Sequence, residues 1–192
     1  NNLGLNVIGS GSTTVLAANI VTAGVDVLID DAVQVDNPSI RIDTTGAGAV
    51  PAGASVTLTG GTRGIFSTAG INNNLTVDGG TDGIVEFGYL NGFGNGATGA
   101  LLGSLTAKGH GITLYNTSTV VGNLTLDSTY ATLFGNVETY LGSINILGET
   151  SLRNDVNLNA GSSIVLGSTV NGSGKNLSLG GQTSVVASGT IQ

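Results

Sequence analysis

One pattern repeats along the second half of the chain, in the segments GSLTA (Gly103–Ala107), GNLTL (Gly122–Leu126), GSINI (Gly142–Ile146) and GSSIVL (Gly161–Leu166). A second series, ITL, ATL and TSL, begins at Ile112, Ala131 and Thr150 and keeps the same spacing. A period of about 19–20 residues is typical of solenoids, in which each repeat buries its apolar face against its neighbours. We therefore expect a stack of short repeats.

The residues of each repeat favour short strands. Val, Ile, Leu and Thr dominate, Gly, Asn, Ser and Asp interrupt them, and helix-forming residues are scarce. One repeat contains a strand at Leu124–Leu126, a second at Ala131–Leu133 and a third near Val137. The prediction is an all-β chain that forms a right-handed parallel β-helix, with about 19–20 residues and three short strands per coil. Leucine-rich repeats share this period, but their Leu-x-x-Leu-x-Leu pattern is missing.

The alternation of residues along each strand predicts which side chains form the core. Leu124 and Leu126 should point inward and Thr125 outward. Equivalent residues of successive repeats should stack about 4.8 Å apart. Two inward ladders are expected, one of Leu105, Leu124, Ile144 and Ile164 and the other of Leu114, Leu133 and Leu152.

The middle of the chain shows pairs of similar segments at the same spacing. GGTRGIF begins at Gly60 and GGTDGIV at Gly79, while ASVTL begins at Ala54 and NNLTV at Asn73. These pairs predict that the same register extends back to about residue 54. We expect residues 1–192 to form a single β-solenoid on this basis.

Two parts of the chain depart from the register. The stretch from Leu75 to Leu105 is too long for one repeat, and the excess coincides with the Gly- and Asn-rich segment at 88–100, which we predict to be an inserted surface loop. Residues 1–45 keep the alternation of strands but hold the period poorly, so they should form irregular first coils or a cap.

The composition excludes several classes of partner. The chain is 40% apolar and 9% charged, but its apolar runs fall far short of the roughly 20 residues of a bilayer-spanning helix, so no transmembrane segment is expected. The net charge is −7 and the five basic residues are scattered, which argues against nucleic acid as a partner. The absence of cysteine is compatible with an extracellular bacterial protein. Because the chain begins at Asn1, we expect a processed chain or an excised piece.

The repeats also resemble a known group of proteins. The text LGSLTAKGHGITLYNTSTVVGNLTL (102–126), with its continuation LGSINILGETSLRNDVNLNAGSSIVLGSTVNGSGKNLSLGG (141–181), is similar to the repetitive passenger regions of Gram-negative surface adhesins. These are the filamentous-haemagglutinin-like proteins of two-partner secretion and the large autotransporters. The resemblance covers roughly residues 50–190 and lies in the pattern. It implies a β-helix displayed at or released from the bacterial cell surface, commonly for attachment.

Catalytic groups are sparse in the sequence. Asp78 and Asp82 are the close carboxylate pair of the regular repeats, and Asp30 and Asp31 should point to opposite faces of a strand. The single histidine, His110, lies in GHG and is interpreted as a turn residue rather than a member of a Ser-His-Asp triad. We therefore expect a chain that is not an enzyme.

We predict that the chain has no cofactor. Calcium is the alternative that the sequence favours among metal ions. Five carboxylates lie close together in the sequence, and oxygen ligands suit calcium: Asp26, Asp30, Asp31, Asp36 and Asp43. The short repeat of calcium-binding β-rolls is absent, which favours a solvated acidic region instead.

Sequons for N-glycosylation occur at Asn74, Asn116, Asn123, Asn171 and Asn176. The alternative interpretation is that Asn, Ser and Thr suit the turns and outward faces of a solenoid.

The candidate binding residues are large outward side chains. If the second ladder points inward, then Tyr115, Phe134 and Arg153 point outward at equivalent positions of three successive repeats and should stack as an aromatic–aromatic–cation column. The alternative is a ladder that only stabilises the fold. Tyr89 and Phe93 in the inserted loop are the other candidates, because binding residues concentrate on loops held by rigid scaffolds.

These patterns predict a non-catalytic extracellular β-helix, located at the bacterial cell surface or secreted, that acts as an adhesin stalk or passenger segment. Its partner would be a host or neighbouring-cell surface protein or glycan. The alternative is a self-stacking subunit of a filament or surface layer that associates end to end, since the last segment SVVASGTIQ carries no charge or proline to protect an open strand edge. A glycan-cleaving β-helix enzyme ranks third, for lack of a carboxylate cluster.

Overall fold

The computed structural model describes residues 4–90, 99–181 and 184–192. Every regular element in these ranges is a β-strand, and the named strands all pair in parallel. One sheet has fifteen strands and the other, β10-β12-β15-β18, has four. The described residues contain no helix that is long and apolar enough to cross a membrane. The all-β class with parallel strands, predicted from the sequence, is therefore confirmed.

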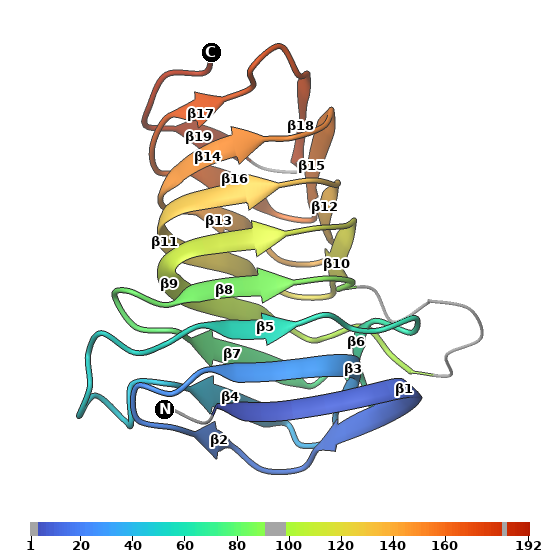
Figure 1. Cartoon of the computed structure of the whole chain (residues 1–192). Coiled ribbons are helices and arrows are strands. Elements are labelled where there is room, and N and C mark those ends of the chain that lie inside the picture. The colour runs from blue at the N-terminus through green and yellow to red at the C-terminus, as the bar shows by residue number, and fades with distance from the viewer. Residues whose placement is uncertain (1–3, 91–98, 182–183) are drawn as a thin grey trace.

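The parallel pairing arranges the strands in three columns that run along the molecule. Figure 1 shows them stacked from β1 and β2 at one end to β17 and β19 at the other. The first column consists of β2 (Ile20–Val21), β4 (Ser39–Asp43), β7 (Asn74–Asp78), the first halves of β9 (Leu105–Leu114) and β11 (Leu124–Leu133), β13 (Ile144–Ile146), β16 (Ser163–Leu166) and β19 (Ser184–Ala187).

The second column lies beside the first. It consists of the start of β1 (Leu5–Leu16), the start of β3 (Val27–Val35), β5 (Val56–Leu58), β8 (Ile84–Phe87), the second halves of β9 and β11, β14 (Glu149–Leu152) and β17 (Val170–Asn171).

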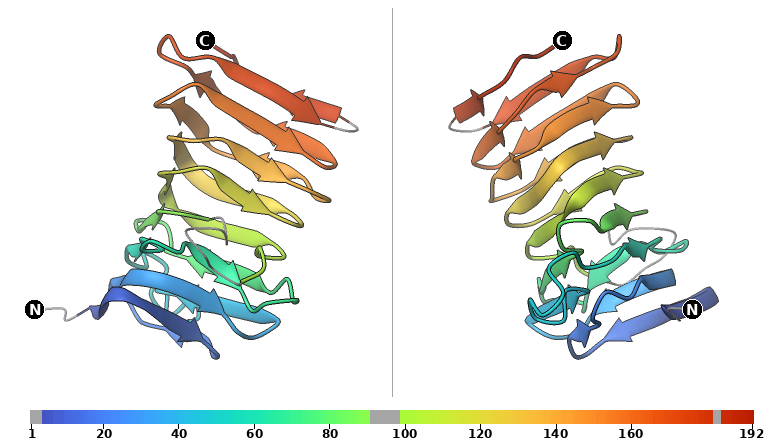
Figure 2. Two further views of the ribbon diagram at one scale, coloured as in Figure 1. Left: turned by 90° about the vertical axis from the view of Figure 1, so that its right-hand side faces the viewer. Right: turned by 60° about the vertical axis from the view of Figure 1, so that its left-hand side comes forward.

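The third column begins with the ends of β1 and β3 and continues with β6 (Ile65–Ser67). Tyr89 and Leu90 connect it by backbone contacts to β10 (Ser118–Val120), which is followed by β12 (Val137–Thr139), β15 (Val156–Ala160) and β18 (Leu177–Gly181). The two turned views in Figure 2 show the same layered arrangement from other sides.

The core lies between the columns and consists mainly of stacked aliphatic side chains, with the fully buried Phe87 among them. Leu105, Leu124, Ile144 and Ile164 occupy paired positions of successive strands and are fully buried. Leu114, Leu133 and Leu152 form a second ladder in the same way. Both predicted ladders are confirmed, as is the outward position of Thr125 between Leu124 and Leu126.

The strand boundaries differ from the prediction where the chain passes from the first column to the second. Leu124–Leu126 and Ala131–Leu133 were expected to be separate strands, but they belong to one strand, β11, as their counterparts do in β9. The first half of β11 pairs with β13, and its second half pairs with β14. His110 therefore lies within β9, and its interpretation as a turn residue was wrong.

The register predicted for the middle of the chain was also wrong. The sequence placed Val56 and Leu75 at equivalent positions of successive repeats, but they lie in different columns. Val56 pairs with Val85, well beyond one period, whereas Leu75 pairs with Ile40 and Leu105. The reason is that long corners, such as the segment 44–55, enlarge these repeats.

The two GGT segments resemble each other because of turn chemistry. The turn at Gly60 leads from β5 to β6, whereas the turn at Gly79 leads from β7 to β8, so the two occupy different corners. Both corners need residues in the left-handed region, with φ of 74° at Gly60, 50° at Gly61 and 75° at Gly80. Glycine adopts this conformation without the steric clash of a Cβ atom, which accounts for the shared text.

The described part of the predicted N-terminal segment, residues 4–45, forms strands that pair in parallel, although their spacing is uneven. Leu5 pairs with Val27 and Thr13 pairs with Ala32, so the interval between partners shortens along β1. The cause is a shift of register between Ile8 and Thr13. Most of the predicted inserted loop, residues 91–98, lies outside the described residues.

Candidate functional site

The predicted aromatic column forms in part. The rings of Tyr115 and Phe134 stack with centroids 5.2 Å apart and an interplanar angle of 29°. The Tyr115 hydroxyl donates a hydrogen bond of 2.8 Å to Glu86 Oε1. This hydrogen bond, together with burial and the negative charge of Glu86, raises the pKa of Tyr115. Tyr115 is nevertheless exposed, so the pair presents an aromatic surface to solvent.

Arg153 occupies the next position of this column. Its backbone N–H donates to Leu133 O, just as the N–H of Phe134 donates to Leu114 O. The Arg153 side chain is exposed. The sequence predicted that all three side chains would stack. Within the described residues the ring stack consists of Tyr115 and Phe134, while Arg153 occupies the predicted next position of the column.

The other two candidate binding residues, Tyr89 and Phe93, belong to the predicted inserted loop at 88–100. Tyr89 is 44% exposed, and its carbonyl oxygen accepts a hydrogen bond from the N–H of Ile65. Phe93 lies outside the described residues.

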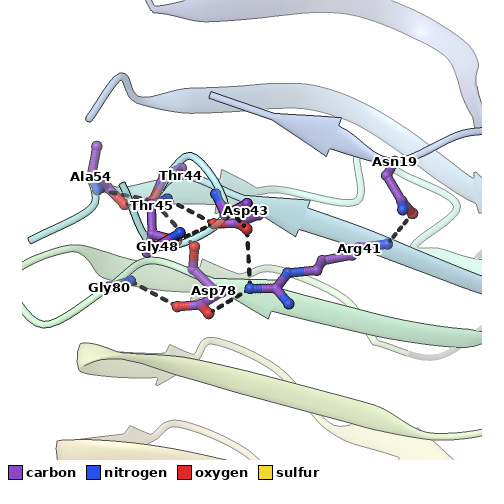
Figure 3. Close-up of polar contacts among 10 residues, drawn as sticks. Asn19, Arg41, Asp43, Thr44, Thr45, Gly48, Ala54, Asp78 and Gly80 are labelled. Carbon is purple, nitrogen blue, oxygen red and sulfur yellow. Dashed lines mark hydrogen bonds and ion pairs between the residues drawn. The ribbon is translucent and has the colours of Figure 1, made fainter. Parts of the chain in front are cut away.

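A second polar cluster, which the sequence analysis did not identify, lies at the ends of β4 and β7. Arg41 Nη2 lies 3.0 Å from Asp43 Oδ2 and 3.0 Å from Asp78 Oδ2 (Figure 3). The backbone N–H of Arg41 also donates to Asn19 Oδ1 at 2.8 Å. Asp43 and Asp78 occupy paired positions of neighbouring strands, and one guanidinium therefore joins two layers of the stack.

Asp43 is buried, and both of its carboxylate oxygens accept hydrogen bonds. Its Oδ1 accepts from the N–H and the hydroxyl of Thr45, at 2.7 and 2.6 Å, and its Oδ2 accepts from the N–H of Ala47 at 3.2 Å. Burial alone would raise the pKa of Asp43, but the bonds from Thr45 and Ala47 and the charge of Arg41 together lower it. Asp43 is thus held as a carboxylate and fixes both Arg41 and the start of the following loop.

A hollow of about 270 Å³ opens beside this cluster. Its lining includes Arg41, Thr45, Asp78, Thr81 and Lys108, so it draws on strands β4, β7 and β9 and on the turns between them. The sequence contains a signal for this column: IRID (40–43), LTVD (75–78), LTAK (105–108) and LTLD (124–127) each place a charged residue after two inward aliphatic positions.

The acidic residues that suggested calcium are not gathered in the structure. Each carboxylate has its own partner: Asp26 accepts from Ser55 N, Asp30 from Thr59 Oγ1, Asp31 from Ser12 and Thr14 hydroxyls, and Asp36 from Thr68 Oγ1. Across residues 4–90, 99–181 and 184–192, no three His, Cys, Asp or Glu side chains could hold a metal ion together. The carboxylates bind turns and neighbouring strands instead.

The sequon asparagines lie at the surface, where several stabilise corners. Asn74, Asn123, Asn171 and Asn176 are exposed and Asn116 is half-buried. Asn116 Nδ2 donates to Gly88 O at 3.2 Å, Asn123 Oδ1 accepts from Ser143 N, Asn171 Oδ1 accepts from Ser173, and Asn176 Nδ2 donates to Asp155 Oδ2. These contacts fit the structural interpretation of the sequons as corner residues.

The catalytic candidates make structural contacts. The exposed His110 ring packs edge-on against Tyr130, with centroids 5.5 Å apart and an interplanar angle of 89°. Asp78 is paired with Arg41, while Asp82 accepts a hydrogen bond from the neighbouring Thr81 hydroxyl at 3.1 Å.

The chain was compared with protein-family models, with curated proteins and with solved structures, and none of the three comparisons found a match.

Proposed function

We propose that the chain is a right-handed parallel β-helix with three strands per coil, which serves as a non-catalytic extracellular shaft with an adhesive surface. The observation that carries this proposal is the parallel pairing of strands in three columns around one apolar core, with Tyr89 and Leu90 joining β6 to β10 in the third column. A stack of this kind gains stability from each added layer and gives an elongated, rigid element. The location at a bacterial cell surface and the role in attachment come from the resemblance to adhesin passengers.

The adhesive contact is assigned to the Tyr115–Phe134 pair. Much of the outward surface of the second column consists of small polar residues such as Thr57, Thr113 and Ser151. Aromatic side chains usually contribute most of the energy of an interface, so the stacked pair is the feature best suited to bind a surface protein or glycan.

A self-stacking subunit is the second candidate. Among the described strands β19 pairs with β16 alone, and its Val185 and Val186 are 44% and 49% exposed. An open strand edge with exposed valines is suited to pair with another strand, which in a filament would come from a second copy.

Electron microscopy of the purified chain separates the two candidates. Separate short rods at all concentrations support the shaft, and fibres that lengthen with concentration support the self-stacking subunit. Compact round particles would contradict both.

Binding to cells or immobilised glycans then tests the adhesive contact. We expect the double variant Tyr115→Ser and Phe134→Ser to lose most of any binding while keeping its β-sheet circular dichroism spectrum, because the inward Leu114 and Leu133 are unchanged. The matched control is Tyr140→Ser with Leu141→Ser, which removes two exposed apolar side chains elsewhere. Equal binding by both double variants would place the contact away from the aromatic pair.

A further inference from the structure

One Asn-Gly pair lies in the described part of the chain, at Asn171 and Gly172, where β17 ends. Two further pairs, which begin at Asn91 and Asn95, fall outside the described residues. An asparagine before a glycine is chemically labile, because the backbone nitrogen of the glycine can attack the side-chain amide carbon and no Cβ atom hinders its approach. The surroundings of Asn171 therefore decide whether this reaction occurs in the folded chain.

The hydrogen bonds of Asn171 favour the attack. Its Oδ1 accepts from the backbone N–H of Ser173 at 3.0 Å and from the Ser173 hydroxyl at 2.9 Å. Two donors on one carbonyl oxygen polarise the amide and stabilise the negative charge that develops on the oxygen during attack. Asn171 is exposed, and within the described residues its Nδ2 makes no hydrogen bond, so ammonia can leave directly into solvent.

The turn after Asn171 fixes this carbonyl in place. A hydrogen bond from an asparagine side chain to the N–H two residues later folds the side chain back along the backbone, past the intervening residue, which here is Gly172. Ser173 has a φ of 47°, in the left-handed region that a residue with a Cβ atom rarely adopts, and its two bonds to Asn171 hold it there. The amide carbon is thus kept beside the nitrogen that would attack it.

The attacking nitrogen is protected by the segment 190–192. The N–H of Gly172 donates to Gln192 O at 2.9 Å, and Gly172 is buried. Backbone hydrogen bonds with Val170 and Gly172 and an isolated bridge at Ile191 attach this segment, and all three of its residues are exposed. Strand ends with few buried contacts open at a low cost in free energy. Opening of 190–192 would release the N–H of Gly172 to solvent.

We propose that Asn171 is a site of spontaneous deamidation, gated by the pairing of segment 190–192. When the segment opens, the Gly172 nitrogen loses its proton to water or hydroxide and attacks Asn171 Cγ. The new N–Cγ bond closes a succinimide ring, the Cγ–Nδ2 bond breaks, and the amide nitrogen takes up a proton and leaves as ammonia. Water then opens the ring at either carbonyl, which gives aspartate or isoaspartate. The inference does not rest on the adhesive or self-stacking role proposed above.

The two products affect the fold differently. Aspartate at position 171 keeps an oxygen acceptor for both Ser173 donors and adds one negative charge to a chain of net charge −7. Isoaspartate lengthens the backbone by one methylene group at a residue that pairs with Ser151 of β14, so it should disturb this end of the second column.

Incubation of the full chain in mildly alkaline buffer, followed by peptide mapping with mass spectrometry, tests the proposal. Each asparagine is followed separately by the mass gained when its amide becomes a carboxylate. We expect Asn171 to convert at least about tenfold faster than Asn157, which is also exposed but is followed by Leu158. Equal rates at the two asparagines, or slower conversion at Asn171, would overturn the site.

A serine variant tests the role of the turn. Ser173→Ala removes one donor to Asn171 Oδ1 and should slow the conversion of Asn171 about fivefold. The matched control is Ser178→Ala, at an exposed serine of β18, which should leave the rate unchanged. An unchanged or faster rate in Ser173→Ala would show that the turn does not promote the attack.

A second variant tests the gate. Ile191→Gly weakens the pairing of 190–192 with Val170 and should speed the conversion of Asn171 about tenfold. The control is Val21→Gly, at an exposed residue of the terminal strand β2 at the other end of the stack, which should leave the rate unchanged. The gate would be refuted by an Ile191→Gly rate no higher than that of the unchanged chain, or by equal acceleration in both glycine variants.

Discussion

At the scale of single residues, Thr150 is the polar member of an otherwise apolar ladder. Val56, Val85, Ile112 and Ala131 occupy the paired positions before it, and Val170 the position after it. Its Oγ1 is buried and has no hydrogen-bond partner within the described part of the chain. An unpaired hydroxyl in an apolar core lowers stability because it loses its hydrogen bonds to water.

Replacing this hydroxyl with a methyl group should therefore stabilise the fold. We expect Thr150→Val to raise the free energy of unfolding by about 1 kcal/mol, measured by urea denaturation. The control is Thr139→Val, which removes an equally buried hydroxyl that donates to Gly142 O at 2.7 Å and should lower stability by a similar amount. A shift of stability in the same direction in the two variants would show that the Thr150 hydroxyl is not unpaired in an apolar environment.

Adjacent residues of β11 provide a second test of the inward register. Leu133 is fully buried, whereas Thr132 points outward and is half-buried. Leu133→Asp would bury an unpaired charge and should destabilise the chain by more than about 4 kcal/mol, while Thr132→Asp should be mild. Thermal denaturation compares them, and equal losses would refute the alternation.

At the scale of elements, Asp43 connects β4 to the loop 44–55. The folded-state pKa of Asp43 is lowered, so its carboxylate contributes stability above the unfolded-state pKa of about 4, and that contribution is lost as the pH falls through the folded-state pKa. We expect Asp43→Asn to lower stability at pH 7 by about 1–3 kcal/mol and to make stability depend less on pH below about 4.

The control for this variant is Asp127→Asn, at an exposed carboxylate of the same column. It should leave the acid dependence close to that of the unchanged chain, as measured by thermal denaturation between pH 2 and 7. An Asp43→Asn variant that loses stability with acid as steeply as the Asp127→Asn control would show that the Asp43 contacts do not stabilise the loop.

The sequence predicts the elements well where the corners are short. From Leu105 to Ile164 the paired core positions recur at one nearly constant spacing, which the sequence alone reveals. The paired positions Val27, Val56, Val85 and Ile112 lie farther apart, because turns of unequal length separate them. A fixed period could not predict which strand pairs with which in that part.

The same limit applies to the candidate sites. Tyr115 and Phe134 lie one repeat apart in the regular part, and their contact followed from the period. Arg41 and Asp78 lie far apart in the sequence, separated by the three connections between β4 and β7. Their contact depends on the length of the loop 44–55 and could not be inferred from spacing, although IRID and LTVD share a charged residue after two aliphatic positions.

At the scale of the whole molecule, we propose that the chain forms one stack of coils. The outward residues of the second column are paired in the order Thr57, Glu86, Thr113, Thr132, Ser151 and Asn171. Neighbouring strands of a sheet lie about 4.8 Å apart. Positions far apart in the sequence should therefore be separated by whole multiples of this spacing.

Distances between pairs of spin labels, measured by electron paramagnetic resonance, test this claim most directly. The chain has no cysteine, so labels can be attached at introduced cysteines alone. We expect backbone separations of about 10 Å for Thr113 and Ser151, about 19 Å for Thr57 and Ser151, and about 24 Å for Thr57 and Asn171, which are two, four and five strand spacings. Narrow distributions that increase in this order would support the stack, whereas distances that do not rise with the number of layers would contradict it.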